Sequence, residues 1–278
     1  METFLMHKLA FDSIPAQNTG RSRGRRTTLA IALTILTLLS TACLPGSRRG
    51  ASMGFDYFVE SKTCNTDQVK ESDRDKYLQI YNAIRIAYAQ DTAQRKNARL
   101  VVTGDSIAAL FMPPLMDKYM PGVNAANRGI GGDTVGLLTT RIEADVLALR
   151  PRAVAISIGG NDILQGRCID HTLDETRKLI QTIKAKAPGT KVLMTSVPPT
   201  LTWKANQVVP FYNWQLKYIT EEFSGVEYID LWRVMSERNV PQLAEPYHAT
   251  LPGGGTDVIH FGEEGYRVWG ELLKPYAR

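Results

Sequence analysis

The sequence predicts an α/β fold in which helices cover both faces of a mostly parallel sheet. From Leu100 to the carboxyl end, short runs of β-branched residues alternate with longer stretches in which apolar residues recur at helical spacing. Strands that alternate with helices in this way build parallel sheets between two helical layers. Length and composition agree with one such domain, because a chain of 278 residues that is 44% hydrophobic and 22% charged is typical of a soluble globular protein.

Residues 1–43 have the composition of an export leader. Four arginines precede an apolar run from Leu29 to Leu39, and small residues at positions 40–42 lead into Cys43. A membrane-spanning helix needs about 20 apolar residues, which is longer than this run. We therefore predict a signal segment and export to the periplasm or the cell exterior.

Cys43 has two interpretations. The sequence before it resembles a bacterial lipoprotein cleavage site, where the cysteine is lipidated and tethers the protein to a membrane. Leu39 lies one position further from the cysteine than the leucine of such sites, and Ser40 and Ala42 also suit ordinary signal peptidase. Lipidation of Cys43 and secretion without an anchor both stay open.

The other two cysteines are Cys64 and Cys168. Disulfide bonds persist in the compartments to which exported proteins go, so an even number of cysteines there is compatible with a bond between them. Two unpaired cysteines are the equal alternative, because the sequence does not give the distance between their Cα atoms.

Residues 44–75 are polar and irregular and contain prolines and glycines, which predicts a linker. The domain is expected at residues 76–278 and begins with a helical extension, because apolar residues at positions 78, 81, 84 and 88 lie at helical spacing. Five strands are expected after it: Leu100–Thr103, Val123–Asn127, Ala153–Ile158, Val192–Val197 and Val226–Ile229.

Four helices are expected in the domain after the first strand. One follows the apolar stripe from Val135 to Leu149, and a second begins at a capping box formed by Thr172 and Glu175. A third ends at Gly225, and a fourth covers residues 263–273. The segments 168–175 and 198–209, the latter with Trp203, are expected to be loops that shape a substrate site.

Four motifs of this domain carry candidate chemistry. Gly104, Asp105 and Ser106 follow the first strand, where a serine would reach the carboxyl edge of the sheet. A glycine-rich turn around Gly132 leads into a helix that Asp133 can cap, and its backbone N–H groups suit a developing negative charge. Asn161 follows the third strand, and its side-chain amide is a neutral hydrogen-bond donor. A plain turn is the alternative for each motif taken alone.

The fourth motif pairs Asp257 with His260 near the carboxyl end. A three-residue interval allows the carboxylate to contact one imidazole nitrogen and leaves the other nitrogen for a serine. The remaining histidines of the domain, His171 in a helix start and His248 in a proline-containing loop, are more simply structural or solvent-exposed.

Together and in this order, the four motifs resemble the SGNH (GDSL) hydrolase superfamily, and the resemblance runs from Leu100 to the carboxyl end. It implies a flavodoxin-like, three-layer α/β/α fold around a five-stranded parallel sheet. It also implies that Ser106 is the nucleophile and that His260 and Asp257 are its base system. The oxyanion hole would be made by the backbone N–H groups of Ser106 and Gly132 and by the side chain of Asn161.

The resemblance predicts a serine esterase that forms an acyl-enzyme without a cofactor or metal ion. Short-acyl esters such as O-acetylated glycans, and lysophospholipids, are the expected substrates. An O-acyltransferase of cell-envelope sugars would use the same residues, and a non-catalytic glycan- or lipid-binding module is the third class. Nucleic acid is not an expected partner, because three of the five net positive charges belong to the leader and no basic stripe follows.

Overall fold

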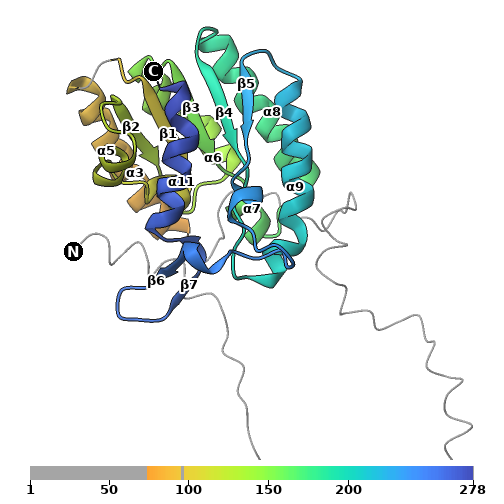
Figure 1. Ribbon diagram of the computed structural model, residues 1–278. Coiled ribbons are helices and arrows are strands. Elements are labelled where there is room, and N and C mark those ends of the chain that lie inside the picture. Colours follow the sequence, from red (N-terminus) through yellow and green to blue (C-terminus); the bar gives the residue numbers. More distant parts are fainter. Residues whose placement is uncertain (1–73, 95–96, 278) are drawn as a thin grey trace, which may run out of the picture. The chain divides into compact units, whose positions relative to one another are not determined.

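The computed structural model describes residues 74–94 and 97–277, and the leader, residues 44–73 of the expected linker, Cys43 and Cys64 lie outside them. Its centre is a parallel sheet of five strands in the order β2-β1-β3-β4-β5, between two layers of helices (Figure 1). The expected α/β fold class is therefore confirmed. The strands are β1 (Leu100–Gly104), β2 (Ala125–Gly129), β3 (Ala153–Ser157), β4 (Lys191–Thr195) and β5 (Val226–Ile229).

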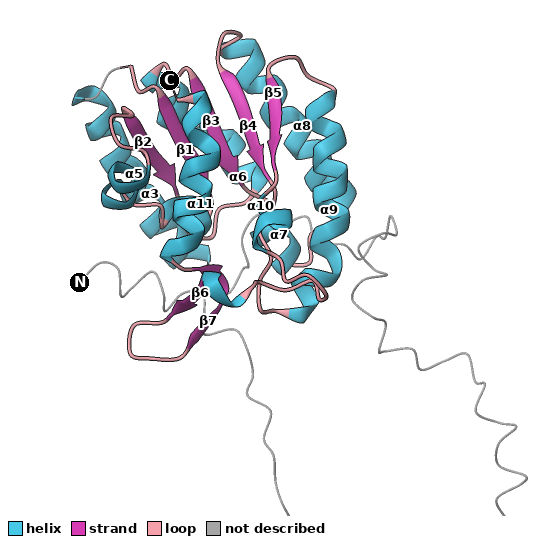
Figure 2. Ribbon diagram, viewed as in Figure 1, coloured by secondary structure: helices cyan, strands magenta, loops and turns pink. Residues whose placement is uncertain are grey.

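Alternate side chains of the strands enter two separate apolar cores. On one face Val101, Val154 and Val192 pack against three helices: α6 (Val135–Arg141), α8 (Ile169–Lys186) and α9 (Trp203–Glu221). On the other face Val102 and Leu193 pack against four helices: α4 (Ser106–Ala109), α5 (Pro113–Tyr119), α10 (Leu231–Met235) and α11 (Glu263–Leu273). Burial on both faces explains why the strands are rich in apolar residues. Figure 2 shows the two layers.

Two helices and an antiparallel strand pair lie outside this alternation. The helix α3 (Arg74–Gln94) precedes β1, and the short helix α7 (Gly160–Leu164) follows β3. An antiparallel pair, β6 (His248–Thr250) and β7 (Thr256–Phe261), precedes α11 near the end of the chain. His248 is thus the first residue of a strand, and its expected position in a loop was wrong; its side chain contacts the Leu243 carbonyl at 3.1 Å.

Two helices begin earlier than the sequence analysis expected. The first residue of α8 is Ile169, and Thr172 lies fully buried within it, where its Oγ1 donates to the Cys168 carbonyl at 3.0 Å. The predicted capping box of Thr172 and Glu175 is therefore wrong. In α9 the buried stripe continues toward the amino end through Ala205 and Val209, so residues 203–209 are helical and not part of a loop.

Two smaller differences concern β2 and α6. The expected strand at Val123–Asn127 begins two residues later, because Val123 still donates its N–H to Met120 in the preceding turn. The predicted helix at Val135–Leu149 is α-helical only to Arg141 and continues as a π-helical and then a 3-10 turn. No helix in the described ranges is long and apolar enough to cross a membrane.

Candidate active site

Ser106 stands at the carboxyl edge of the sheet because a sharp turn separates β1 from α4. Gly104, the last residue of β1, has φ of +132°, and a Cβ there would lie 1.7 Å from the Ser157 carbonyl oxygen. Only glycine allows this approach. Asp105 then caps α4, since its Oδ1 accepts the Ile107 N–H at 3.0 Å. Ser106 is therefore the first residue of a helix.

His260 and Asp257 reach Ser106 from β7. The Nε2 atom of His260 lies 2.8 Å from the Oγ of Ser106, and its Nδ1 lies 2.9 Å from Oδ2 of Asp257. Both the histidine and the aspartate are buried. The structure thus joins the three residues in one hydrogen-bonded chain, although the serine precedes the histidine by 154 positions.

The Asp257 carboxylate is well supplied with donors. Its Oδ1 accepts the backbone N–H groups of Ile259 and His260, each at 2.9 Å. Burial raises the pKa of Asp257, but the hydrogen bond and charge of His260 and the two N–H groups outweigh this and lower the pKa to about 2. The carboxylate stays ionised at neutral pH and can orient the imidazole.

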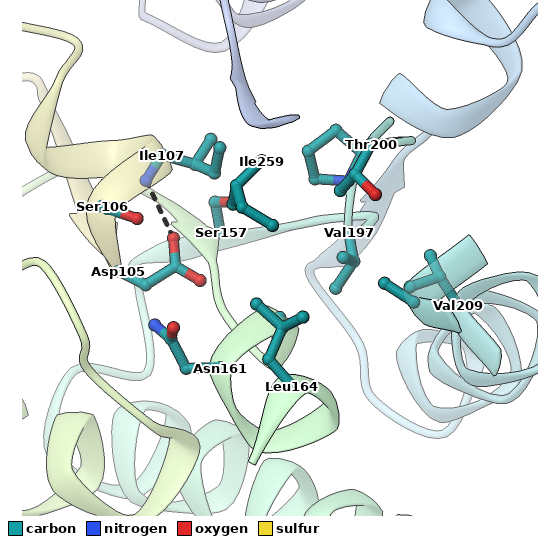
Figure 3. A pocket seen from close by; sticks show the side chains of 13 residues that line it. Asp105, Ser106, Ile107, Ser157, Asn161, Leu164, Val197, Thr200, Val209 and Ile259 are labelled. Atoms are coloured by element: carbon teal, nitrogen blue, oxygen red, sulfur yellow. Dashed lines mark hydrogen bonds between the residues drawn. The ribbon is translucent and has the colours of Figure 1, made fainter. Parts of the chain in front are cut away.

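The predicted oxyanion donors lie on the other side of Ser106. Asn161 lies in the first turn of α7, and its Nδ2 donates to the backbone carbonyl of Asp133 at 2.9 Å. Ser106 and Asn161 line the same pocket (Figure 3). Gly132 is not among the lining residues but is the neighbour of Asp133. Within the described part of the chain, the N–H groups of Ser106 and Gly132 donate no hydrogen bond.

Asp133 does not cap the helix that follows it, contrary to the expectation. Thr134 is the cap of α6, and its side chain accepts the Leu137 N–H. The Asp133 carboxylate instead contacts the fully buried Arg141, whose Nε and Nη2 lie 2.9 and 2.6 Å from Oδ2. Asp133 thus forms a buried ion pair with a residue of α6, and Thr134 is the residue that caps the helix.

The pocket beside Ser106 has an apolar wall. Its volume is about 30 Å³, and Figure 3 shows Leu164, Val197, Val209 and Ile259 around it. Val209 belongs to the segment 198–209 that was expected to shape the substrate site, although this part of it is helical. The other three were not anticipated as pocket residues, and Val197 reads as a strand residue. The other histidines are elsewhere: His171 on α8 lies 3.4 Å from Glu175 and, like His248, does not line the pocket.

The remaining expectations of the sequence analysis concern a cysteine and a metal ion. Cys168, the cap of α8, is disulfide-bonded, and its partner lies outside the described residues. Its pairing with Cys64 therefore stays a prediction. Within residues 74–94 and 97–277, no three His, Cys, Asp or Glu side chains are grouped so that they could hold a metal ion.

The model of the GDSL-like lipase/acylhydrolase family matches residues 92–268. The chain belongs to this family. The resemblance inferred from the four motifs is thereby confirmed, and a GDSL-like lipase/acylhydrolase is an enzyme type that hydrolyses acyl esters.

The relatives of this GDSL-like chain are distant. Thioesterase 1/protease 1/lysophospholipase L1 of Escherichia coli is 28% identical over 116 residues, which are 39% of this chain and 56% of the relative. The chain thus spans about half the length of that protein. An acylhydrolase-like structure from Bacteroides fragilis is 25% identical, with a TM-score of 0.58 over 68% of this chain and 92% of the other.

A GDSL-like lipase structure from Bacteroides thetaiotaomicron has a similar fold. It is 22% identical, with a TM-score of 0.59 over 69% of this chain and 95% of the other. At this identity the likeness concerns the fold, which agrees with the five-stranded parallel sheet described above.

Proposed function

We propose that this chain is a serine esterase that cleaves short acyl esters through an acyl-enzyme on Ser106. The observation that carries the proposal is the continuous contact from the Ser106 hydroxyl through His260 to Asp257, at 2.8 and 2.9 Å. A nucleophile bonded to a base that is itself oriented by a third group is the arrangement needed for acyl transfer.

In the proposed mechanism His260 accepts the proton of Ser106 as its oxygen attacks the ester carbonyl. Asp257 stabilises the imidazolium that forms, and its lowered pKa keeps it ionised throughout. The tetrahedral oxyanion is held by the N–H groups of Ser106 and Gly132 and by the Asn161 amide. His260 then donates its proton to the leaving alcohol, and water activated by the same imidazole releases the acid.

The preference for a short acyl group rests on the pocket. A cavity of about 30 Å³ exceeds the roughly 10–15 Å³ that a single water requires, but only by two- to three-fold. Such a space suits an acetyl methyl and is lined by the apolar side chains of Leu164, Val197, Val209 and Ile259. Longer chains would force these side chains aside, which costs about 1–3 kcal/mol. We therefore favour O-acetyl esters, including those of glycans, over lysophospholipids.

The sequence-based proposals for the remainder of the chain are unchanged. Export by residues 1–43, lipidation of Cys43 and the boundary at residue 43 concern segments outside the described residues, as does Cys64. The expected domain start at residue 76 lies within α3, which begins at Arg74. We keep export as part of the proposed function, because acetylated envelope glycans and lipids are found outside the cytoplasm.

Hydrolysis of p-nitrophenyl esters from acetate to octanoate by the full chain tests the proposal. We expect acetate to have the highest kcat/KM, at least about ten-fold above octanoate, and Ser106→Ala to abolish turnover. Ser224→Ala is the matched control, because this serine is exposed beyond α9. Turnover that survives Ser106→Ala would refute the nucleophile. Acyl transfer to an added sugar in preference to water would favour the transferase instead.

A further inference from the structure

The helix α3 contacts the segment that carries Gly132, one of the three proposed oxyanion donors. We define the oxyanion loop as residues 129–137, between the end of β2 and the first turn of α6. The Tyr88 hydroxyl donates to the Gly129 carbonyl at 2.5 Å, and the Tyr81 hydroxyl donates to the Leu137 carbonyl at 3.2 Å. One helix therefore binds the loop at both ends.

Tyr77 contacts the middle of the same loop. Its ring lies against Gly132, so that a Cβ at Gly132 would be 2.8 Å from the Tyr77 Cε2 atom. Gly132 also has φ of +81°, which glycine adopts without strain. The ring thus closes one side of the peptide whose N–H is proposed to bind the oxyanion.

The position of Gly132 is coupled to that of Asn161. The carbonyl of Asp133, the next residue, accepts the Asn161 Nδ2 at 2.9 Å. A displacement of this part of the oxyanion loop would therefore move two of the three proposed donors together. Active-site groups must be held within about 0.5 Å of the productive geometry.

Two ion pairs in the carboxyl-terminal half of α3 also fix the helix to the domain. Arg85 lies 3.0 Å from Asp145 in the π-helical turn, and Arg128 of β2 lies 2.5 Å from Asp91. Most of α3 precedes residue 92, where the family match begins. The contacts with the oxyanion loop thus come from a helix that the family model does not include.

We propose that α3 is a positioning element of the oxyanion hole, in which the Tyr77 ring holds Gly132 in place. The inference rests on the proposed function, since it assigns a support to the same site. The role belongs to the ring, because the buried Tyr77 hydroxyl has no hydrogen-bond partner among the described residues. Tyr77 touches neither the nucleophile nor the base and acts through Gly132.

Three variants of the full chain distinguish a role of Tyr77 in positioning Gly132 from a role in protein stability alone. Tyr77→Ala removes the ring, Tyr77→Phe removes only the hydroxyl, and Ile86→Ala changes an exposed side chain of the same helix. We expect Tyr77→Ala to lower kcat for p-nitrophenyl acetate by about 10- to 100-fold with little change in KM, because a misplacement of about 1 Å costs that much. Tyr77→Phe and Ile86→Ala should retain kcat within about two-fold.

Inhibition by a small alkylboronic acid gives a second readout, since its tetrahedral serine adduct places an oxygen in the oxyanion hole. Its inhibition constant should rise in Tyr77→Ala by about the same factor as kcat falls. Loss of kcat without weaker boronate inhibition would contradict the proposal, as would equal kcat in Tyr77→Ala and Ile86→Ala.

Tyr88→Phe covers the case in which Tyr77→Ala does not fold, because it deletes only the hydrogen bond to Gly129. We expect a several-fold loss of kcat at an unchanged melting temperature, and an unchanged kcat would contradict the role of α3. Failure of the proposed function is distinguishable: Ser106→Ala would then retain turnover, whatever the Tyr77 variants do.

Discussion

Asp105 and Asp257 are both buried beside Ser106, yet their surroundings give them opposite acidities. Two backbone N–H groups and the His260 ring contact Asp257, whose pKa falls to about 2. Oδ1 of Asp105 accepts the Ile107 N–H. Burial, opposed by hydrogen bonding to this N–H and reinforced by the Asp133 and Asp162 carboxylates, raises the pKa of Asp105 to about 8.

This difference in pKa shows that a carboxyl group near a nucleophile need not be ionised or take part in the reaction. Burial raises the pKa of both groups, and the donors and charges that face each carboxyl group decide whether it is an anion or an acid at neutral pH. Asp257 can therefore stabilise an imidazolium, whereas Asp105 holds a helix start as a neutral acid. Four predictions test this comparison.

The largest expected effect comes from exchanging each carboxyl group for an amide. Asp257→Asn should lower kcat/KM for p-nitrophenyl acetate at pH 7 by about 10⁴-fold, because an amide fixes His260 in the wrong tautomer. Asp105→Asn should cost less than about ten-fold, since an amide resembles the neutral acid and keeps an acceptor for Ile107. Similar losses in the two variants would remove the distinction between the aspartates.

A second prediction extends the comparison to Asp133, whose donors come from an arginine. Arg141→Met would leave the fully buried Asp133 carboxylate without its charged partner. The free energy of unfolding, measured with urea, should fall by about 3–5 kcal/mol. Arg267→Met, which opens an exposed ion pair with Glu264 on α11, should change stability far less. Equal stability losses would mean that Asp133 does not depend on its buried partner.

The third prediction contrasts the base side of Ser106 with the oxyanion side. Asn161→Ala should lower kcat by roughly 100- to 1,000-fold at nearly constant KM, because the amide would act only in the transition state. Asn124→Ala is the control, since this exposed asparagine lies before β2 and donates only to Asn97. A loss of a few-fold or less in Asn161→Ala would assign its amide to holding Asp133 alone.

The structure brings the candidate residues of the sequence analysis together where chemistry and strand ends coincide. Parallel strands end at one edge of a sheet, so Ser106 after β1 and Asn161 after β3 were expected to meet. His260 followed from its spacing to Asp257 and from the scarcity of histidines. The family and the five-stranded fold were likewise accessible, because alternating strand and helix patterns admit few arrangements.

The features that the sequence did not reveal depend on how the elements pack against one another in the folded protein. Arg141 lies within the apolar stripe of α6 and gives no sign that it faces Asp133. The burial of Thr172 was equally hidden, since its spacing to Glu175 fits a helix cap as well as a helix interior. The pKa values of Asp105 and Asp257 were not predictable for the same reason, because they depend on the burial, the N–H groups and the charges around each carboxyl group.

The last prediction concerns the pH dependence of stability. In the unfolded chain Asp105 ionises near its ordinary pKa of about 4, whereas the folded protein keeps the proton until about pH 8. Over this window the folded state binds more protons, so its stability falls as pH rises, by at most about 1.4 kcal/mol per pH unit. Asp105→Asn removes this dependence.

Urea unfolding at pH 5 and pH 8 checks this expectation. The Asp105→Asn protein should gain stability relative to the parent as pH rises from 5 to 8. Asp257→Asn serves as the opposite case: the stability from its lowered pKa is complete above about pH 4 and is lost only as pH falls toward 2. The difference in the free energy of unfolding between Asp257→Asn and the parent should therefore be constant between pH 5 and 8. If the difference in the free energy of unfolding between Asp105→Asn and the parent is also constant from pH 5 to 8, then Asp105 is ionised in the folded protein, despite its burial beside Ser106.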